Sequence, residues 1–576
     1  MLYSVAPVDA VTNPGWYIAE LIETDNIDNA WDPQVAVDPT GNATVVWYQH
    51  DGTRYNIWSN RYNAGIGWGT AGLIETNNIG DAAYPQVAVD PYGNAVAVWQ
   101  HYDGTRVNIW SNRYTAGVGW DNAQLIETDN DGGAAYPQVA VDSAGNAVAV
   151  WYQFDGTRNN ICSNLFTAGV GWGTAELIET NDTGNAYDPQ VAIDPKGNAV
   201  VVWYQIDGLH VNILSNRYTA GVGWGTAQLI ENNDDGNAVY PHVAVDPTGN
   251  ATAVWIQQGG LGFIWSNRYT TGVGWGTAEF IDIPGGGTPF EPQVAVDTAG
   301  NAVAVWEQND GTRYNIWSNR YTSGVGWGTA GLIETDNTGD ALEPQVAVDT
   351  YGNAVAIWHQ SDGKRHNIWS NRYTKDTGWG KPELVETANT GFADNPQVAI
   401  DKDGNVVAVW YQNDGMRYNI WSNHYFIPDT TPPSLSLESP SDGLTLDRPV
   451  VAVYGKTEFD AVLSVNGILV KVRSDGSFKC NISLHDGINT IVVTATDPWD
   501  NSAMVSREVF YSDPIPSLIE NISTVQERMI SLEAEMNMMN DDIIFLLNML
   551  SYLKYQLNNT YDDLELVLKN LSCLES

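Results

Sequence analysis

PQVAVDPYGNAVAVWQHYDGTRVNIWSNRYTAGVGWDNAQLIETDNDGGAAY, residues 85–136, is followed at Pro137 by nearly the same sequence again. The proline that opens this stretch recurs at steps of 52, 52, 52, 52, 51, 52 and 52 residues. The copies begin at Pro33, Pro85, Pro137, Pro189, Pro241, Pro292, Pro344 and Pro396. Repeats of this size at a near-fixed period indicate stacked units or a closed ring of units.

Each copy contains four short segments that are typical of β-strands. In the second copy they are residues 86–90, 94–100, 108–114 and 123–128, which are rich in Val, Ile, Trp and Tyr. Gly and Asn in the intervening turns supply the positive φ that tight hairpins require. No part of the repeat has helical periodicity. Four antiparallel strands in a unit of about 50 residues predict one blade of a β-propeller.

The two ends of the repeat series complement each other. The eighth copy contains Trp410 and Trp421 but has no third Trp and no fourth strand. Near the N-terminus, WYIAELIET at 16–24 matches the fourth-strand sequence WGTAQLIE at 224–231. A strand at 18–24 that completes the last blade would remove two exposed sheet edges. The predicted fold is therefore mainly β, with an eight-bladed β-propeller over residues 15–427 that is closed by an N-terminal strand.

A different all-β module follows the repeats. Residues 428–433, PDTTPP, predict a stiff proline-rich linker, and seven short strand-like segments predict a β-sandwich over residues 434–513. The diagnostic stretches are Thr431-Pro-Pro, Glu438-Ser-Pro-Ser-Asp-Gly443, Val465-Asn-Gly467, Ser474-Asp-Gly-Ser-Phe478, Gly487-Ile-Asn-Thr-Ile491 and Ala495-Thr-Asp497. With these the module resembles the prokaryotic immunoglobulin-like (Ig-like) modules of secreted surface proteins. The resemblance implies an extracellular spacer or adhesion module without catalytic residues.

The C-terminal segment has a heptad pattern. From Leu518 to Leu574, apolar residues follow alternating steps of four and three, and Thr560 is the one polar residue in the series. This pattern predicts an α-helical coiled coil over residues 515–576, a rod of about 85 Å at 1.5 Å per residue. Such a rod would make the protein a homo-oligomer. The alternative is a helix that folds back on its own domain.

Composition limits the classes of partner. The formal net charge of −43 argues against nucleic-acid binding, which requires a basic patch. It fits a solvated acidic surface or cation binding, and calcium is the candidate cofactor. Three cysteines, Cys162, Cys480 and Cys573, are too few and too scattered for a disulfide framework. No stretch has the 18–20 apolar residues of a transmembrane helix, and no signal peptide is visible at the N-terminus.

The hairpin after the third strand carries a second resemblance. In Thr115-Ala-Gly-Val-Gly-Trp120, Gly117 and Trp120 stand where an Asp-box has Gly and Trp, although the Asp is absent. The repeats thus resemble degenerate members of the sialidase-like (BNR or Asp-box type) propeller superfamily. That family implies an arginine triad, a Tyr–Glu pair and an acidic residue, each supplied once by a different blade. None of these can be placed here, and a symmetric ring offers the same environment eight times, so no enzymatic activity is predicted.

One loop of the repeat is the candidate ligand site. The Asp-Gly-Thr-Arg loop between the second and third strands, and the acidic link between blades, are predicted to lie on one face. The candidate ligand-binding residues are Asp51, Arg54, Asp103, Arg106, Asp155, Arg158, Asp310, Arg313, Asp362, Arg365, Asp414 and Arg417. Asp336 and Asp340 of one link are the candidate calcium ligands. The simpler alternative is that each Asp shapes its own turn and each Arg packs locally.

These features predict a non-catalytic, secreted or cell-surface protein of a prokaryote. Its ring would be a multivalent adhesion head for glycan or surface-protein ligands, carried on an oligomerising stalk. A structural component of a cell envelope or appendage is the first alternative, and a glycan-active, sialidase-like enzyme is the second. The repeated tryptophans are interpreted as core between blades, because most stand in the middle of strands.

Overall fold

The computed structural model describes residues 14–572 apart from a set of short gaps. The gaps are 25–26, 77–78, 128–131, 181–183, 232–235, 259–261, 284–285, 336–337, 389, 428–429, 460, 474, 498–500 and 537–542. The chain divides into two compact units, Met1–Ile427 and Pro428–Ser576.

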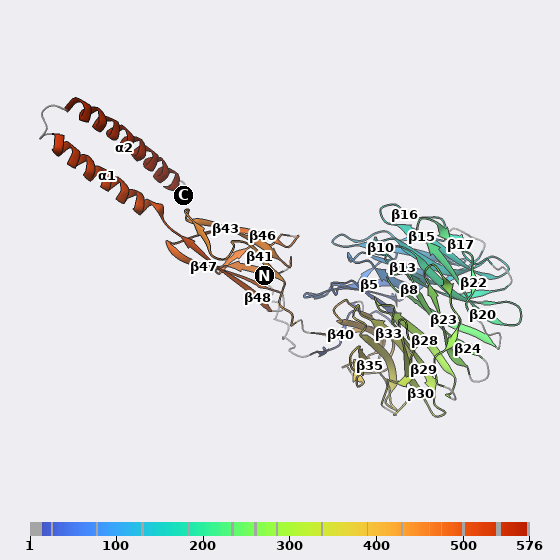
Figure 1. Cartoon of the computed structure of the whole chain (residues 1–576). Helices are drawn as coiled ribbons and strands as arrows, with labels where there is room; N and C mark the ends of the chain where they lie inside the picture. The colour runs from blue at the N-terminus through green and yellow to red at the C-terminus, as the bar shows by residue number, and fades with distance from the viewer. Residues whose placement is uncertain are drawn as a thin grey trace. The chain divides into compact units, whose positions relative to one another are not determined.

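The first unit contains eight five-stranded antiparallel sheets of one topology (Figure 1). The first strands are β3 (Ala30–Val37), β8 (Ala82–Val89), β13 (Ala134–Val141), β18 (Ala186–Ile193), β23 (Asn237–Val245), β28 (Pro289–Val296), β33 (Ala341–Val348) and β38 (Ala393–Ile400). The second strands are β4 (Ala43–His50), β9 (Ala95–Tyr102), β14 (Ala147–Phe154), β19 (Ala199–Ile206), β24 (Ala251–Gln258), β29 (Ala302–Asn309), β34 (Ala354–Ser361) and β39 (Val406–Asn413). The third strands are β5 (Tyr55–Asn63), β10 (Val107–Thr115), β15 (Asn159–Thr167), β20 (Val211–Thr219), β25 (Phe263–Thr270), β30 (Tyr314–Thr322), β35 (His366–Thr374) and β40 (Tyr418–Phe426).

The fourth position of each sheet holds two very short strands in place of one. Both pair with the third strand, as β11 (Gly119–Trp120) and β12 (Gln124–Leu125) do with β10. The other pairs are β6 (Gly67–Trp68) and β7 (Gly72–Leu73), β16 (Gly171–Trp172) and β17 (Glu176–Leu177), β21 (Gly223–Trp224) and β22 (Gln228–Leu229), β26 (Gly274–Trp275) and β27 (Glu279–Phe280), β31 (Gly326–Trp327) and β32 (Gly331–Leu332), and β36 (Gly378–Trp379) and β37 (Glu383–Leu384).

The sheets form a closed, propeller-like ring. Each first strand packs against the first strand of the next sheet, and β38 packs against β3. The N-terminal strands β1 (Gly15–Trp16) and β2 (Glu20–Leu21) pair with β40 and fill the fourth position of the last sheet. The Trp16 indole also donates a 2.9 Å hydrogen bond to the Ser370 hydroxyl of the preceding sheet. The first and last parts of the repeat region therefore share one sheet.

The core lies between neighbouring sheets. The largest fully buried side chains are the tryptophans of the second strands, at Trp47, Trp99, Trp151, Trp203, Trp255, Trp306, Trp358 and Trp410. Each packs with Val, Ile and Ala side chains of two adjacent sheets, as Trp47 does with Val409 and Ile420. The interpretation of these tryptophans as core is confirmed.

The second unit begins with a β-sandwich. One sheet has the order β41 (Leu435–Ser439), β43 (Val450–Thr457), β46 (Ser477–Ser483). The other has the order β42 (Leu444–Leu446), β48 (Ser502–Tyr511), β47 (Gly487–Thr496), β44 (Val462–Val465), β45 (Ile468–Val470). Val453, Leu463, Phe478 and Val493 lie in the core that the two sheets share.

The prediction of one long C-terminal coiled coil is wrong. The segment forms two shorter helices, α1 (Pro514–Met536) and α2 (Ile543–Ser572), which contact each other and run side by side in Figure 1. Met529 and Leu550, two residues of the predicted seam, are buried. Because the segment forms two helices that contact each other, one continuous rod of about 85 Å does not form, and the homo-oligomer stays a prediction. Neither helix is long and apolar enough to cross a membrane.

The closing segment provides a test of the ring. Ile22 is 1% exposed, packs among residues of the first and last sheets, and donates its N–H to the Ile420 carbonyl at 3.0 Å. We expect Ile22→Ala to lower the free energy of unfolding by about 3 kcal/mol, because it leaves a cavity in this core. Ile18→Ala, at a 78% exposed position of the same segment, should change it by less than about 0.5 kcal/mol. Urea unfolding followed by tryptophan fluorescence measures both, and equal effects would contradict the packing of the closing segment.

Candidate functional site

Each first strand has a bulge where the repeat proline stands. In β8 the register with β9 shifts between Ala83 and Gln86, and Tyr84 in the bulge has φ of 51°. Proline lacks the N–H that a sheet needs and disfavours right-handed helical backbone for the residue before it. Positive φ is unusual for residues other than glycine, and bulges re-aim side chains. The same left-handed backbone occurs in all eight sheets, at Asp32, Tyr84, Tyr136, Asp188, Tyr240, Glu291, Glu343 and Asn395.

The left-handed residues meet at one end of the ring's centre. Together with the residue two positions later in each strand, they border two cavities of about 310 and 260 Å³. The cavities share Tyr136, Gln138 and Glu291, so they lie next to each other. The later residues are Gln34, Gln86, Gln138, Gln190, His242, Gln293, Gln345 and Gln397. We call these two sets of residues the channel mouth.

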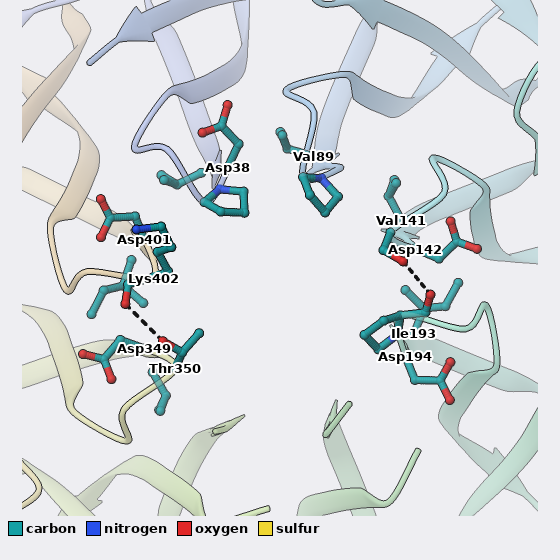
Figure 2. A pocket seen from close by; sticks show the side chains of 17 residues that line it. Asp38, Val89, Val141, Asp142, Ile193, Asp194, Asp349, Thr350, Asp401 and Lys402 are labelled. Atoms are coloured by element: carbon teal, nitrogen blue, oxygen red, sulfur yellow. Dashed lines mark hydrogen bonds between the residues drawn. The ribbon is translucent and has the colours of Figure 1, made fainter. Parts of the chain in front are cut away.

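The opposite end of the ring's centre has a cavity whose lining differs from that of the channel mouth. A cavity of about 300 Å³ there is lined by the turns that follow the first strands, and Val89, Val141 and Pro195 belong to its wall. Figure 2 shows the Asp38, Asp142 and Asp349 carboxylates pointing away from the cavity. Each is held in its own turn, as Asp38 is by the backbone N–H groups of Thr40 and Asn42. The carboxylates at this end shape turns and leave a largely apolar cavity.

Tyrosines occupy one side of the channel mouth. The Tyr84 and Tyr136 rings stack with centroids 5.1 Å apart and planes at 29°, and their side chains are 39% and 45% exposed. Tyr48 and Tyr152 extend the row, with centroids 6.1 Å from Tyr84 and 5.7 Å from Tyr136 respectively. The bulges thus present two adjacent aromatic rings to the cavity.

Carboxyl groups occupy another side. Burial, together with the charge of Glu343, raises the pKa of Asp32 and that of Glu291 to about 6. Behind them, burial and Glu291 raise the pKa of Glu307 to about 8. Asn395 joins this side, since its N–H donates to Glu343 at 3.0 Å and its amide donates to Asp32 at 3.2 Å. Asp32 and Glu291 therefore change charge just below neutral pH, Glu307 keeps its proton at neutral pH, and groups with such shifted pKa values are common at functional sites.

The Asp-Gly-Thr-Arg loops are separate turns. In the second sheet, Asp103 accepts hydrogen bonds from the N–H groups of Thr105 and Arg106, at 2.8 and 3.0 Å, and from the Asn108 amide at 2.9 Å. The other five aspartates, Asp51, Asp155, Asp310, Asp362 and Asp414, accept the corresponding backbone bonds. The Thr105 hydroxyl and the backbone N–H groups hold the pKa of Asp103 well below its usual range.

Four of the predicted aspartates form an ion pair with the Arg of their own turn. The Arg Nε lies 3.6–4.0 Å from the Asp Oδ2 in the pairs Asp51–Arg54, Asp155–Arg158, Asp310–Arg313 and Asp362–Arg365. Arg106 and Arg417 follow Asp103 and Asp414 in the same kind of turn. None of these residues is among the described residues that line the mouth.

The two predicted calcium ligands, Asp336 and Asp340, belong to the link between the sixth and seventh sheets. Asp340 accepts a 2.8 Å hydrogen bond from the N–H of Tyr314, and it thereby fixes the start of β30. Asp336 lies outside the described residues. The calcium prediction stays a prediction.

Sequence reasoning missed the channel mouth. The signal was the residue before the repeated proline, which changes among Asp, Tyr, Glu and Asn while the following Pro-Gln is almost constant. An X-Pro step inside a strand marks a bulge, so this variable position was a candidate for a re-aimed side chain.

A second group of polar side chains lies beside the mouth. His359 of β34, His366 of β35 and Asp394 of β38 each offer a ligand atom, and these atoms lie within 4.8 Å of one another. Glu343 of the mouth is 3.2 Å from the His359 Nδ1. Among the described residues, this is the group whose spacing suits a metal ion.

Comparison with known proteins concerns the two units separately. A family model described as glucodextranase, domain B, matches residues 433–512. A search of curated protein sequences found no match. A solved structure of a Dyadobacter fermentans protein of unknown function has 13% identity and a TM-score of 0.38, covering 72% of this chain and all of that one.

Two further similar structures are propeller enzymes. A leech intramolecular trans-sialidase has 10% identity and a TM-score of 0.34, covering 71% of this chain and 93% of that one. A Penicillium chrysogenum α-L-arabinanase has 14% identity and a TM-score of 0.34, covering 51% and 94%. At these identities and TM-scores, the similarities assign no ligand and no activity to this chain.

The buried glutamate behind the mouth predicts a pH dependence. Glu307 ionises near pH 4.5 when unfolded and near 8 when folded, so the folded chain loses stability as the pH rises between these values. Glu307→Gln keeps an acceptor for the Glu343 N–H and removes the charge. We expect this variant to unfold at higher urea concentration than the parent at pH 8, and the difference to shrink at pH 4.5. Glu20→Gln, at an exposed position of β2, is the control; a parallel gain there would contradict the assignment.

Proposed function

We propose that the ring is a non-catalytic carbohydrate-binding head and that the channel mouth is its binding site. The observation that carries this proposal is the stacked, part-exposed pair Tyr84 and Tyr136 on neighbouring strands of the mouth. The C–H face of a sugar ring packs on an aromatic ring, and two adjacent rings accommodate neighbouring sugar units. Aromatic walls with a few convergent polar groups are typical of ligand sites.

The polar groups needed to bind sugar hydroxyls lie beside the tyrosines. Gln86 and Gln138 follow the two tyrosines in their strands and line the same cavity. A Gln amide offers two donors and one acceptor oxygen, and a carboxyl group that is ionised accepts only. Hydroxyl groups both donate and accept, so they match this mixed set of groups.

The charges of the residues that line the mouth favour some classes of carbohydrate over others. The described residues that line the two mouth cavities include Asp32, Asp188, Glu291 and Glu343 but neither Lys nor Arg. An anionic sugar such as a sialic acid would bring its carboxylate toward these groups without a cation to receive it. The mouth therefore favours neutral or amino sugars over sialylated ones.

Glycoside hydrolysis is a second candidate function, and one observation favours it. Asp32 and Glu291 have pKa values raised to about 6, a property of carboxylic acids that donate a proton to a leaving group. A second carboxylate must then act as nucleophile or base. Glu343 is close enough to influence both, but its Oε2 accepts the Asn395 N–H. Binding is preferred to catalysis because the stacked tyrosines serve it directly, whereas raised carboxyl pKa values also occur in structural networks.

A glycan array with the full chain tests the proposal. We expect binding to neutral or amino sugars, and we expect Tyr136→Ala to weaken it about 10-fold or more, since an aromatic contact in a binding site contributes about 1–2 kcal/mol. Tyr92→Ala is the matched control, because Tyr92 is a 73% exposed tyrosine in a turn at the other end of a first strand. It should leave the affinity unchanged.

Several outcomes separate the candidates. Equal loss in the two variants, no binding, or a preference for sialylated glycans would each overturn the assignment of the mouth. Hydrolysis of a bound glycan that stops in Glu291→Gln, while binding persists, would establish the enzyme in place of the binding head.

A further inference from the structure

One junction of the ring differs from the others at three positions together. His359 occupies a position that holds Tyr48 in the first sheet and Tyr411 in the last, and His366 one that holds Tyr55 and Tyr418. The remaining equivalents of His359 are Gln100, Tyr152, Tyr204, Ile256 and Glu307, and those of His366 are Val107, Asn159, Val211, Gly262 and Tyr314. The equivalents of Asp394 are Trp31, Ala83, Ala135, Tyr187, Val239, Phe290 and Leu342, all without charge.

The next junction shows what these positions do elsewhere. There Trp31 packs on Tyr411 and Tyr418, with ring centroids 4.9 and 4.2 Å apart. That aromatic cluster is replaced, between the seventh and eighth sheets, by two imidazoles and a carboxylate. Exchanging aromatic contacts for polar groups in a part-buried place is costly unless the polar groups gain partners. Here the imidazoles pair with Asp394 and Glu343, and the joint replacement brings together side chains of the kinds that bind metal ions.

The geometry fits a metal ion. The Asp394 Oδ1 lies 2.5 Å from the His366 Nδ1 and 3.7 Å from the His359 Nδ1. The Glu343 Oε2 lies 3.2 Å from the same His359 nitrogen. Zn²⁺ with bonds of about 2.0–2.2 Å in a tetrahedron separates its ligand atoms by about 3.3 Å, so small adjustments of these side chains would suffice.

The burial of His359 is a second, independent observation. His359 is 4% exposed, so neighbouring side chains hold its ring, and the nitrogen that faces Glu343 and Asp394 is Nδ1. Its imidazole lies parallel to that of His366, at 7° and with centroids 4.8 Å apart, so the two rings present the same edge to Asp394. The Nδ1 atoms of both imidazoles therefore face Asp394, with Glu343 beside that of His359, and burial of His359 keeps its ring in this orientation.

We propose that His359, His366 and Asp394, with Glu343 as a fourth ligand, bind one divalent transition-metal ion of the zinc type. Imidazole nitrogens with one or two carboxylates suit Zn²⁺ and Co²⁺, whereas Ca²⁺ and Mg²⁺ require oxygen ligands. The ion would join β33, β34 and β35 of one sheet to β38 of the next. It would also partly neutralise Glu343, which belongs to the channel mouth.

Titration of the chelator-treated full chain with Zn²⁺ tests the site by calorimetry, with Co²⁺ as a spectroscopic probe. We expect one equivalent of metal to bind, and Co²⁺ to give the visible absorption of a four-coordinate site. The variant His359→Tyr/His366→Tyr introduces the pair that stands in the first and last sheets, so it should fold as the parent does. Its affinity for Zn²⁺ should fall at least 10-fold.

Two more variants make the outcome decisive. Asp394→Asn keeps the shape of the side chain and should weaken Zn²⁺ binding, while His485→Gln removes an exposed histidine of the second unit and should leave it unchanged. Binding to the histidine double variant with the parent's stoichiometry and affinity would overturn the site. So would a parent chain that binds no Zn²⁺ or prefers Ca²⁺. None of these readouts depends on carbohydrate binding, so this proposal and that of the binding head can fail separately.

Discussion

A buried, hydrogen-bonded carboxylate between neighbouring sheets is the constraint on which the ring depends. The Trp47 indole donates to the Gln49 side chain at 3.0 Å, and Gln49 donates at 3.0 Å to Glu23, which follows β2 of the last sheet. The same three-residue link recurs with Gln153 and Glu127, Gln360 and Glu334, and Gln412 and Glu386. A carboxylate inside a protein is costly without such partners, so a sheet that slipped by one residue would be strongly disfavoured. Each of these links ties the second strand of one sheet to the segment after the short strands of the preceding sheet, and so fixes how these neighbouring sheets, with the bulges on their first strands, lie beside each other.

Much of the fold could be predicted because its signals are local. Alternating apolar residues and Gly-containing turns specify the three long strands of each sheet without reference to the rest of the chain. Of the fourth strand expected at 123–128, β12 forms among the described residues, while β11 forms before that range, because pairing with β10 depends on a register that the sequence does not display. The heptads of 515–576 were misread for a related reason. An apolar seam specifies a helical partner, but it does not say whether that partner is a second chain or the next helix.

The candidate site was less predictable, since it depends on backbone geometry and on convergence of distant strands. That Asp103 caps its own turn follows from the known behaviour of Asp-Gly turns, and the alternative of a locally satisfied turn was open from the sequence. The mouth required two facts that no single repeat contains. One is the positive φ of residues such as Tyr84, and the other is the meeting of eight first strands at one end of the ring. The residues that recur in every repeat form the sheets and their core, whereas the proposed sites consist largely of residues at positions that vary between repeats.

The channel mouth and the proposed metal site share Glu343, and this links their occupancy. Glu343 contacts His359, accepts the N–H of Asn395, and contributes to the raised pKa values of Asp32 and Glu291. A cation beside Glu343 would weaken that repulsion and make its neighbours easier to ionise. The mouth would then offer more carboxylate acceptors and fewer carboxylic acid donors to a ligand's hydroxyl groups. Because coupling between two binding sites is reciprocal, a ligand that prefers the ionised mouth would in turn favour metal binding. Metal binding at the junction of the seventh and eighth sheets would thus change the charge of the channel mouth, to which all eight sheets contribute.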